Sequence, residues 1–148
     1  MGWIDDLRGG TVGLDTAPLI YFIERHHSRA AKLKPFFAAA ERREFRIVTS
    51  VVTLIEVLVR PFRSGRNDLV DEYRDILLRS NSVTAMAIDE EIAEEAARLR
   101  AQYGLKVPDA IQLATAKVGG ASWFLTNDAN LPFIPSITLL VVDRLETS

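Results

Sequence analysis

Short apolar runs of strand length alternate with longer amphipathic segments along nearly the whole chain of 148 residues. β-Branched and aromatic residues mark the short runs, and apolar residues at helical spacing mark the longer segments. We expect strands at residues 11–14, 45–49, 83–88, 122–125 and 138–142. Strands that alternate with helices form a mostly parallel sheet with both faces covered. The pattern therefore predicts an α/β fold.

The segments between these strands are expected to be helical. The expected helices cover residues 16–24, 28–43, 50–60, 68–79, 89–103 and 108–118, with a helical turn at 127–131. Pro61 is expected to stop the third helix. The chain contains no repeat, low-complexity stretch or long linker, so residues 1–148 should form a single domain, with residues 1–10 as an additional N-terminal arm.

Charge and composition exclude several classes of protein. The formal net charge is −2 and there are no cysteines, which argues against a broad basic surface and excludes disulfides and thiolate metal sites. The first ten residues lack the basic and apolar regions of a signal peptide, and no apolar run is long enough to span a membrane. We therefore expect a soluble, cytoplasmic protein that does not enter membranes.

Three acidic residues stand at junctions between expected elements. Asp15 ends the first strand, Asp128 follows the fourth strand, and Asp109 comes directly after Pro108 at the start of a helix. Ligands of open parallel sheets bind beyond the carboxyl ends of the strands, so these side chains can converge there. Each also has a structural interpretation, because aspartate is a favoured helix cap and first-turn residue.

Glu56 lies in a nearly uninterrupted apolar stretch, residues 50–59. The helix is expected to bury it, and a buried carboxylate needs a cation or a raised pKa. An ion pair with Arg60, one turn along, is the structural alternative. Clustered carboxylates repel one another, and a divalent ion relieves that repulsion. Oxygen ligands suit Mg²⁺ or Mn²⁺, which can bind a phosphodiester and activate water.

The sequence resembles the PIN-domain nucleases, and within them the VapC-type toxin ribonucleases of VapBC toxin–antitoxin pairs. Four stretches carry the resemblance in the family's order: residues 12–21 (VGLDTAPLIY), 49–58 (TSVVTLIEVL), 108–116 (PDAIQLATA) and 124–128 (FLTND). The resemblance implies a three-layer α/β/α fold with a five-stranded parallel sheet. It also implies an endoribonuclease that hydrolyses RNA, a small antitoxin whose tail can occupy the acidic pocket, and a homodimer.

The resemblance assigns a role to each acid. Asp15 and Asp109 would bind Mg²⁺ or Mn²⁺ directly, and Glu56 and Asp128 would complete the shell and help to activate the nucleophile. Three neighbouring polar residues would hold carboxylates or waters in place: Thr16, Thr126 and Asn127.

Other residues give weaker signals. An expected loop at residues 60–67 holds Arg60, Arg63 and Arg66 and no acid, and arginine suits RNA phosphates, although an ordinary solvated loop explains it equally well. His26 and His27 follow a helix end and are interpreted as surface residues.

Two alternative functions remain. An aspartyl-phosphate protein is disfavoured because Asp15-Thr16-Ala17 lacks a second aspartate and no lysine follows Lys117. The second alternative is a catalytically inactive PIN-like module that binds RNA or protein.

Overall fold

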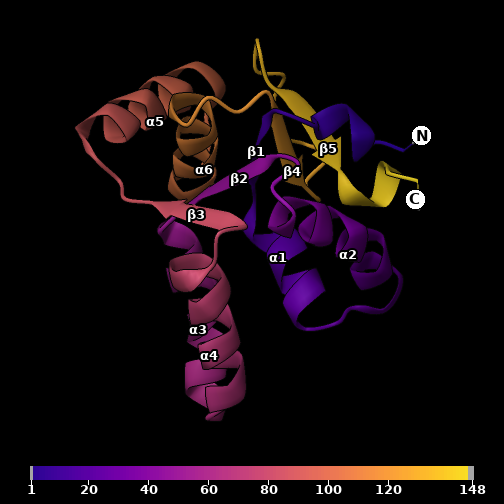
Figure 1. The fold of residues 1–148 in the computed structure, drawn as a ribbon. Coiled ribbons are helices and arrows are strands. Elements are labelled where there is room, and N and C mark those ends of the chain that lie inside the picture. The colour runs from indigo at the N-terminus through magenta and orange to yellow at the C-terminus, as the bar shows by residue number, and fades with distance from the viewer. Residues whose placement is uncertain (1, 147–148) are drawn as a thin grey trace.

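A five-stranded parallel sheet forms the centre of the protein in a computed structural model, which describes residues 2–146 (Figure 1). All neighbouring strands pair in parallel, in the order β3-β2-β1-β4-β5. The strands are β1 (Thr11–Leu14), β2 (Arg46–Ser50), β3 (Val83–Met86), β4 (Trp123–Thr126) and β5 (Thr138–Val141). This arrangement confirms the predicted sheet.

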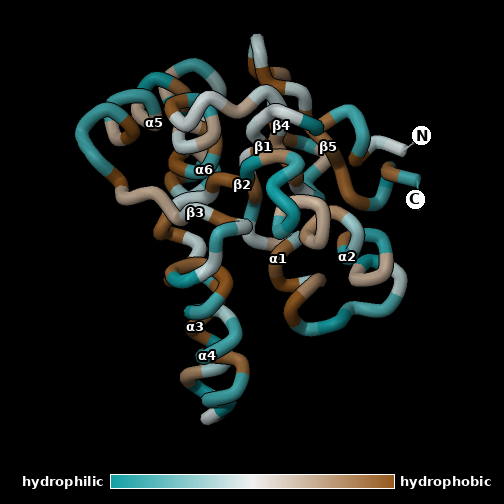
Figure 2. The backbone as a smooth tube through the Cα atoms, viewed as in Figure 1, coloured by the Kyte–Doolittle hydropathy of each residue, from teal (hydrophilic) through white to brown (hydrophobic). Residues whose placement is uncertain are grey.

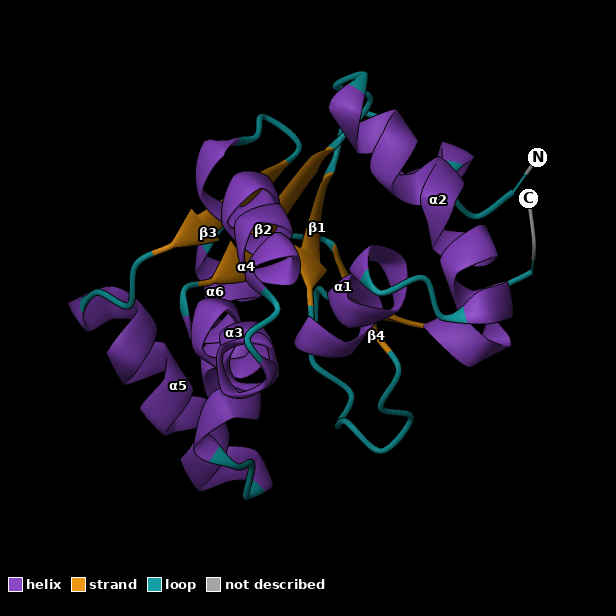
Figure 3. Cartoon of the chain, turned by 90° about the horizontal axis from the view of Figure 1, so that it is seen from below, coloured by secondary structure: helices purple, strands orange, loops and turns teal. Residues whose placement is uncertain are grey.

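Helices cover both faces of this sheet, which confirms the three-layer α/β/α fold (Figure 3). α1, with α2 packed on it, covers one face and α6, with α5 packed on it, covers the other, while α3 and α4 pack on each other and project beyond the sheet (Figure 1). The helices are α1 (Thr16–Ile23), α2 (His27–Glu41), α3 (Val52–Ser64), α4 (Asn67–Arg74), α5 (Glu90–Tyr103) and α6 (Val107–Val118). A π-helical turn at Asp75–Arg79 continues α4.

Alternating side chains of β1 build the two apolar layers. Val12 and Leu14 are fully buried in the cluster beneath α1 and α2. Gly13 faces α6, where a Cβ atom would lie 2.5 Å from the Cβ of Ala116. A residue without a side chain is therefore needed for α6 to approach the central strand this closely.

The N-terminal residues pack on the same core. Leu7, in a 3₁₀ turn at Asp5–Leu7, is fully buried. The Trp3 ring stacks on Phe36 with centroids 5.5 Å apart. The segment before β1 thus contributes apolar contacts to the domain.

Two predictions about the helices are wrong. α3 continues through Pro61 to Ser64, because the buried proline packs within the fold and Gly65 ends the helix with φ 68°. The expected loop at 60–67 is therefore largely helix. Residues 127–131 form a turn instead of a helix, since the Asp128 carboxylate accepts from the Asn130 N–H.

Hydropathy along the backbone follows these layers (Figure 2). Hydrophobic residues mark the strands, and they also recur along the projecting α3 and α4. Within residues 2–146, no helix combines the length and the apolar character needed to cross a membrane.

Candidate functional site

The strand order reverses between β1 and β4, because the chain runs outward through β2 and β3 on one side and through β5 on the other. Helix N-termini and strand ends leave an opening for ligands at such a reversal. Asp15 directly follows β1, and Asp128 lies two residues beyond the end of β4. The sheet therefore brings these two junction acids to the same edge.

Asp15 is held from both strands. Its Oδ1 accepts from the backbone N–H of Thr16 at 2.9 Å, which caps α1, and its Oδ2 accepts from the Thr126 hydroxyl at 2.8 Å. Thr126 Oγ1 also accepts from the backbone N–H of Asp128 at 3.0 Å. Asp15 is thus both the predicted helix cap and a carboxylate fixed at the strand reversal.

Glu56 reaches the same edge from α3. Its side chain is exposed, so the prediction of burial is wrong: this face of the helix, with Ile55 66% exposed, points away from the core. Glu56 Oε1 accepts from the Thr16 hydroxyl at 2.7 Å. None of the ion pairs between described residues includes Glu56, so the alternative partnership with Arg60 is not formed.

Repulsion between the acids shows that they share one neighbourhood. Burial raises the pKa of Asp15, and the charges of Asp109 and Glu56 raise it further, against the hydrogen bonds from Thr126 and Thr16. A carboxyl pKa raised by burial and by neighbouring acids is common at functional sites.

Asp109 adds the fourth acid to this neighbourhood. It lies in the first turn of α6. Partial burial raises its pKa, the charges of Asp128 and Glu56 add to the rise, and Lys106 opposes it. All four predicted acids are therefore linked electrostatically through Asp109 and Asp15.

The donor chemistry of this cluster fits a hard divalent cation, because every candidate ligand is a carboxylate oxygen and none is in an ion pair between described residues. Within residues 2–146, no group of three or more acidic or histidine side chains has the arrangement of a metal site.

A buried polar layer lies beneath the acids. Thr49, Thr53 and Gln112 are at most 2% exposed, and they hydrogen-bond to one another and to Thr16. Sequence reasoning did not single out these three residues. The available signal was polar side chains at helical spacing from Glu56 and Asp109 within otherwise apolar segments.

Asn127 has a different role from its neighbours at the site. Its side chain bonds to the Tyr21 hydroxyl at 3.1 Å and to both the backbone and the carboxylate of Asp143. Asp143 in turn forms two hydrogen bonds with Arg29. Asn127 therefore ties the end of β4 to α1 and to the segment after β5.

The weaker candidates lie on the surface. Arg60 and Arg63 are exposed on α3, and Arg66 forms a two-point ion pair with Asp68 at 3.0 and 2.8 Å. Contact of these arginines with RNA stays a prediction. His26 and His27 are exposed at the start of α2.

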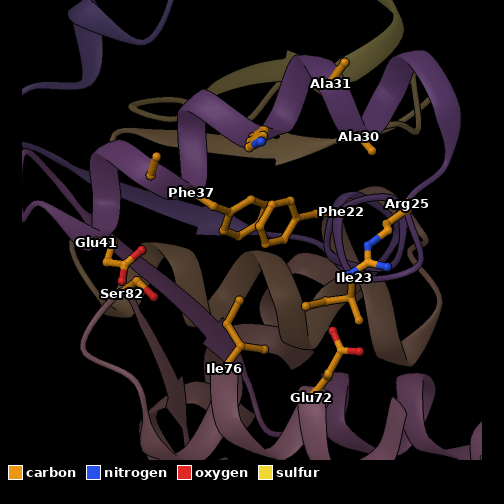
Figure 4. Close-up of a pocket in the computed structure, with 12 residues that line it drawn as sticks. Phe22, Ile23, Arg25, Ala30, Ala31, Phe37, Glu41, Glu72, Ile76 and Ser82 are labelled. Atoms are coloured by element: carbon orange, nitrogen blue, oxygen red, sulfur yellow. The ribbon is translucent and has the colours of Figure 1, made fainter. Parts of the chain in front are cut away.

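A separate pocket of about 570 Å³ opens between α1, α2 and the α4 region (Figure 4). The stacked rings of Phe22 and Phe37, 4.2 Å apart, lie at its centre, with Ile76 across from them. Glu41 and Glu72 lie at its margin (Figure 4). The pocket thus combines an apolar floor with a charged rim.

Residues 12–135 match the model of one protein family, the PIN domain. The chain belongs to the PIN-domain family. The matched range contains all four acids, β4 and all of β1 except its first residue, Thr11. A search of curated proteins gives no match.

Solved structures share the fold of this PIN domain. A toxin–antitoxin complex from Klebsiella pneumoniae is 26% identical, with a TM-score of 0.62, over 86% of this chain and 95% of that one. VapBC2 from Rickettsia felis, bound to a promoter DNA fragment, is 20% identical with a TM-score of 0.65, over 88% and 98%. DNA-bound VapBC from Salmonella typhimurium is 17% identical with a TM-score of 0.69, over 90% and 98%.

Proposed function

We propose that this PIN domain is the toxin of a toxin–antitoxin pair and a Mg²⁺- or Mn²⁺-dependent endoribonuclease. The observation that carries the proposal is the grouping of four carboxylates around the carboxyl ends of β1 and β4, none of which forms an ion pair between described residues. The similarity to a Klebsiella pneumoniae toxin–antitoxin complex supports the toxin role.

Asp15 and Asp109 would hold the divalent ion, with Glu56 and Asp128 completing the shell directly or through water. The ion would neutralise the phosphodiester and promote ionisation of the attacking water. The fixed groups of the chain prepare this site: Thr126 and the Thr16 N–H orient Asp15. Thr16 engages Oε1 of Glu56, which leaves Oε2 as the oxygen that would accept a proton from the water.

Cleavage of labelled RNA by the purified protein tests the activity. We expect cleavage with added Mn²⁺ and none with a chelator, and a loss of at least about 100-fold in Asp15→Asn. Asparagine retains the capping oxygen for α1, so the fold should persist. The same substitution at the exposed Asp6 is the matched control. Equal cleavage by wild type and Asp15→Asn would contradict the proposal and favour the inactive-module alternative.

We propose that an apolar segment of the antitoxin binds in the pocket between α1, α2 and α4. Apolar anchors in such grooves supply affinity, and charged margins supply specificity. Ala31 is exposed on the pocket wall, so Ala31→Arg should fill the groove without disturbing the core.

Co-purification with the product of the adjacent reading frame tests whether the antitoxin binds in this pocket. We expect Ala31→Arg to lose the partner and keep RNA cleavage, and Ala101→Arg, at an exposed position on α5, to keep both. Retention of the partner by Ala31→Arg would place the antitoxin elsewhere.

A further inference from the structure

The buried amide of Gln112 lies at the centre of the polar layer beneath the acids. It is 2% exposed, on the inner side of α6 and one turn after Asp109. Its Oε1 accepts from the backbone N–H of Ser50 at 3.3 Å. Because that N–H can only donate, the amide is fixed with its Nε2 toward Thr53 and Thr16.

The hydroxyl protons of this layer have fixed directions, because the amide donates from Nε2 and the layer ends at a carbonyl and a carboxylate that can only accept. Gln112 Nε2 donates to Thr53 Oγ1 at 2.6 Å. Thr49 donates to the carbonyl of Leu14 at 2.7 Å, so in its 3.0 Å contact with Thr53 the hydroxyl of Thr53 must be the donor.

Thr16 donates to the acid, because a carboxylate oxygen can only accept. Thr53 has already used its proton, and Gln112 offers its remaining N–H to Thr16 Oγ1 at 3.4 Å. The Thr16 proton points to Glu56 Oε1, 2.7 Å away. Glu56 is exposed, and this hydrogen bond from Thr16 holds its side chain against the fold.

We propose that Gln112 is a positioning residue of the acidic site, which orders the threonine hydroxyls so that Thr16 holds Glu56 toward Asp15 and Asp109. The inference rests on the proposed metal-dependent activity. Because Gln112 is buried beneath the acids, it would act on Glu56 through Thr53 and Thr16. Partners that orient metal ligands in this way are commonly worth about 10- to 100-fold in metal affinity or activity.

A double-mutant cycle with Mn²⁺ as the probe tests this role. We expect Gln112→Met and Thr16→Val each to weaken Mn²⁺ binding, measured calorimetrically without RNA, by about 10- to 100-fold. The double variant with Gln112→Met and Thr16→Val should lose no more Mn²⁺ affinity than either single variant, because both substitutions act on the hydrogen bond from Thr16 to Glu56. A residue with only a structural role would give additive losses, and that result would overturn the proposal.

Rate measurements and a second pair of variants distinguish a positioning role of Gln112 from simple misfolding of the variants. In RNA cleavage, Gln112→Met should lower kcat and leave KM nearly unchanged. Thr53→Val should reproduce the loss of Mn²⁺ affinity, and Thr53→Ser, which keeps the hydroxyl, should restore it. Gln102→Met, at an exposed position on α5, is the matched control and should behave as wild type.

The outcomes separate this proposal from the proposed function. A wild type that binds Mn²⁺ and cleaves RNA, together with unchanged Gln112→Met and Thr53→Val, would overturn the role of Gln112 alone. A folded wild type that neither binds Mn²⁺ nor cleaves RNA would overturn both.

Discussion

At the scale of single residues, the acids destabilise the fold in which they are gathered. The folded-state pKa of Asp109 is raised above its ordinary value of 3.8, first by burial and then by Asp128 and Glu56. The folded protein therefore holds this proton more strongly than the unfolded chain. Stability must fall as pH rises from about 3.8 through the raised pKa, and must remain reduced above it.

This loss of stability with rising pH can be tested with Asp109→Asn in metal-free buffer. We expect similar melting temperatures for variant and wild type near pH 3, and an increasingly higher value for the variant toward about pH 7. Asp143, whose pKa Arg29 and Asn127 hold down at about 2, acts in the opposite direction, but both proteins contain it. A difference that does not change with pH, or one equal to that of Asp6→Asn, would contradict the expectation.

The sequence predicted which residues gather at the site better than it predicted their surroundings. Positions after strands and before helices predicted that Asp15, Asp109 and Asp128 converge, and in the structure Asp109 is close enough to both of the others for their charges to interact. The burial of Glu56 was wrong because apolar composition does not tell which face of a helix meets the core. Gln112 was missed because its hydrogen-bond partners come from three segments remote in sequence.

At the scale of elements, α3 carries a row of apolar side chains that the domain leaves uncovered. Ile55, Val59 and Phe62 are 66%, 40% and 57% exposed, and their spacing of four and three residues places them on one helix face. Full burial of such side chains is worth about 1.5–3 kcal/mol each. We therefore propose this row as part of the homodimer interface that the family resemblance implies.

Substitution of Phe62 by lysine tests that interface. We expect wild type to elute as a dimer in light-scattering chromatography, and Phe62→Lys to shift to the monomer mass and stay folded, with a lower melting temperature because association no longer stabilises the folded state. Phe133, 79% exposed in the loop after β4, is a matched aromatic control, and Phe133→Lys should stay dimeric. A monomeric wild type at micromolar concentration, or disruption by Phe133→Lys alone, would contradict the assignment.

The course of α3 also shows how far local signals reach. Pro61 predicts a helix end because proline lacks the N–H and crowds the preceding turn. The helix nevertheless continues to Ser64, with Pro61 buried and α3 packed against α4. The strand positions depended on local pattern and were predicted within two residues, whereas this boundary depended on tertiary packing.

At the scale of the whole molecule, the site depends on strand order. Alternation of strands and helices predicted a parallel sheet, but the order β3-β2-β1-β4-β5 results from long-range pairing that no local pattern encodes. Only the pairing of β1 with β4 places Thr126 beside Asp15. The site is thus a property of the folded sheet, and an ion bound there should stabilise the folded state over the unfolded chain.

Thermal unfolding with added Mn²⁺ measures that coupling. At an ion concentration ten times Kd, linkage adds about 1.4 kcal/mol, which raises Tm by roughly 3–6 °C for a chain of this size. The increase should disappear in Asp15→Asn and persist in Asp6→Asn.

Two acids of the site hold their protons more strongly than free carboxyls, because burial and neighbouring charges raise the pKa of Asp15 and of Asp109. A divalent ion that binds these carboxylates would have to displace those protons. A Tm increase that is greater near neutral pH than at pH 4 would fit this account, since protonated carboxyls bind the ion poorly. An equal increase in Asp15→Asn would instead show that Mn²⁺ binds elsewhere on the surface.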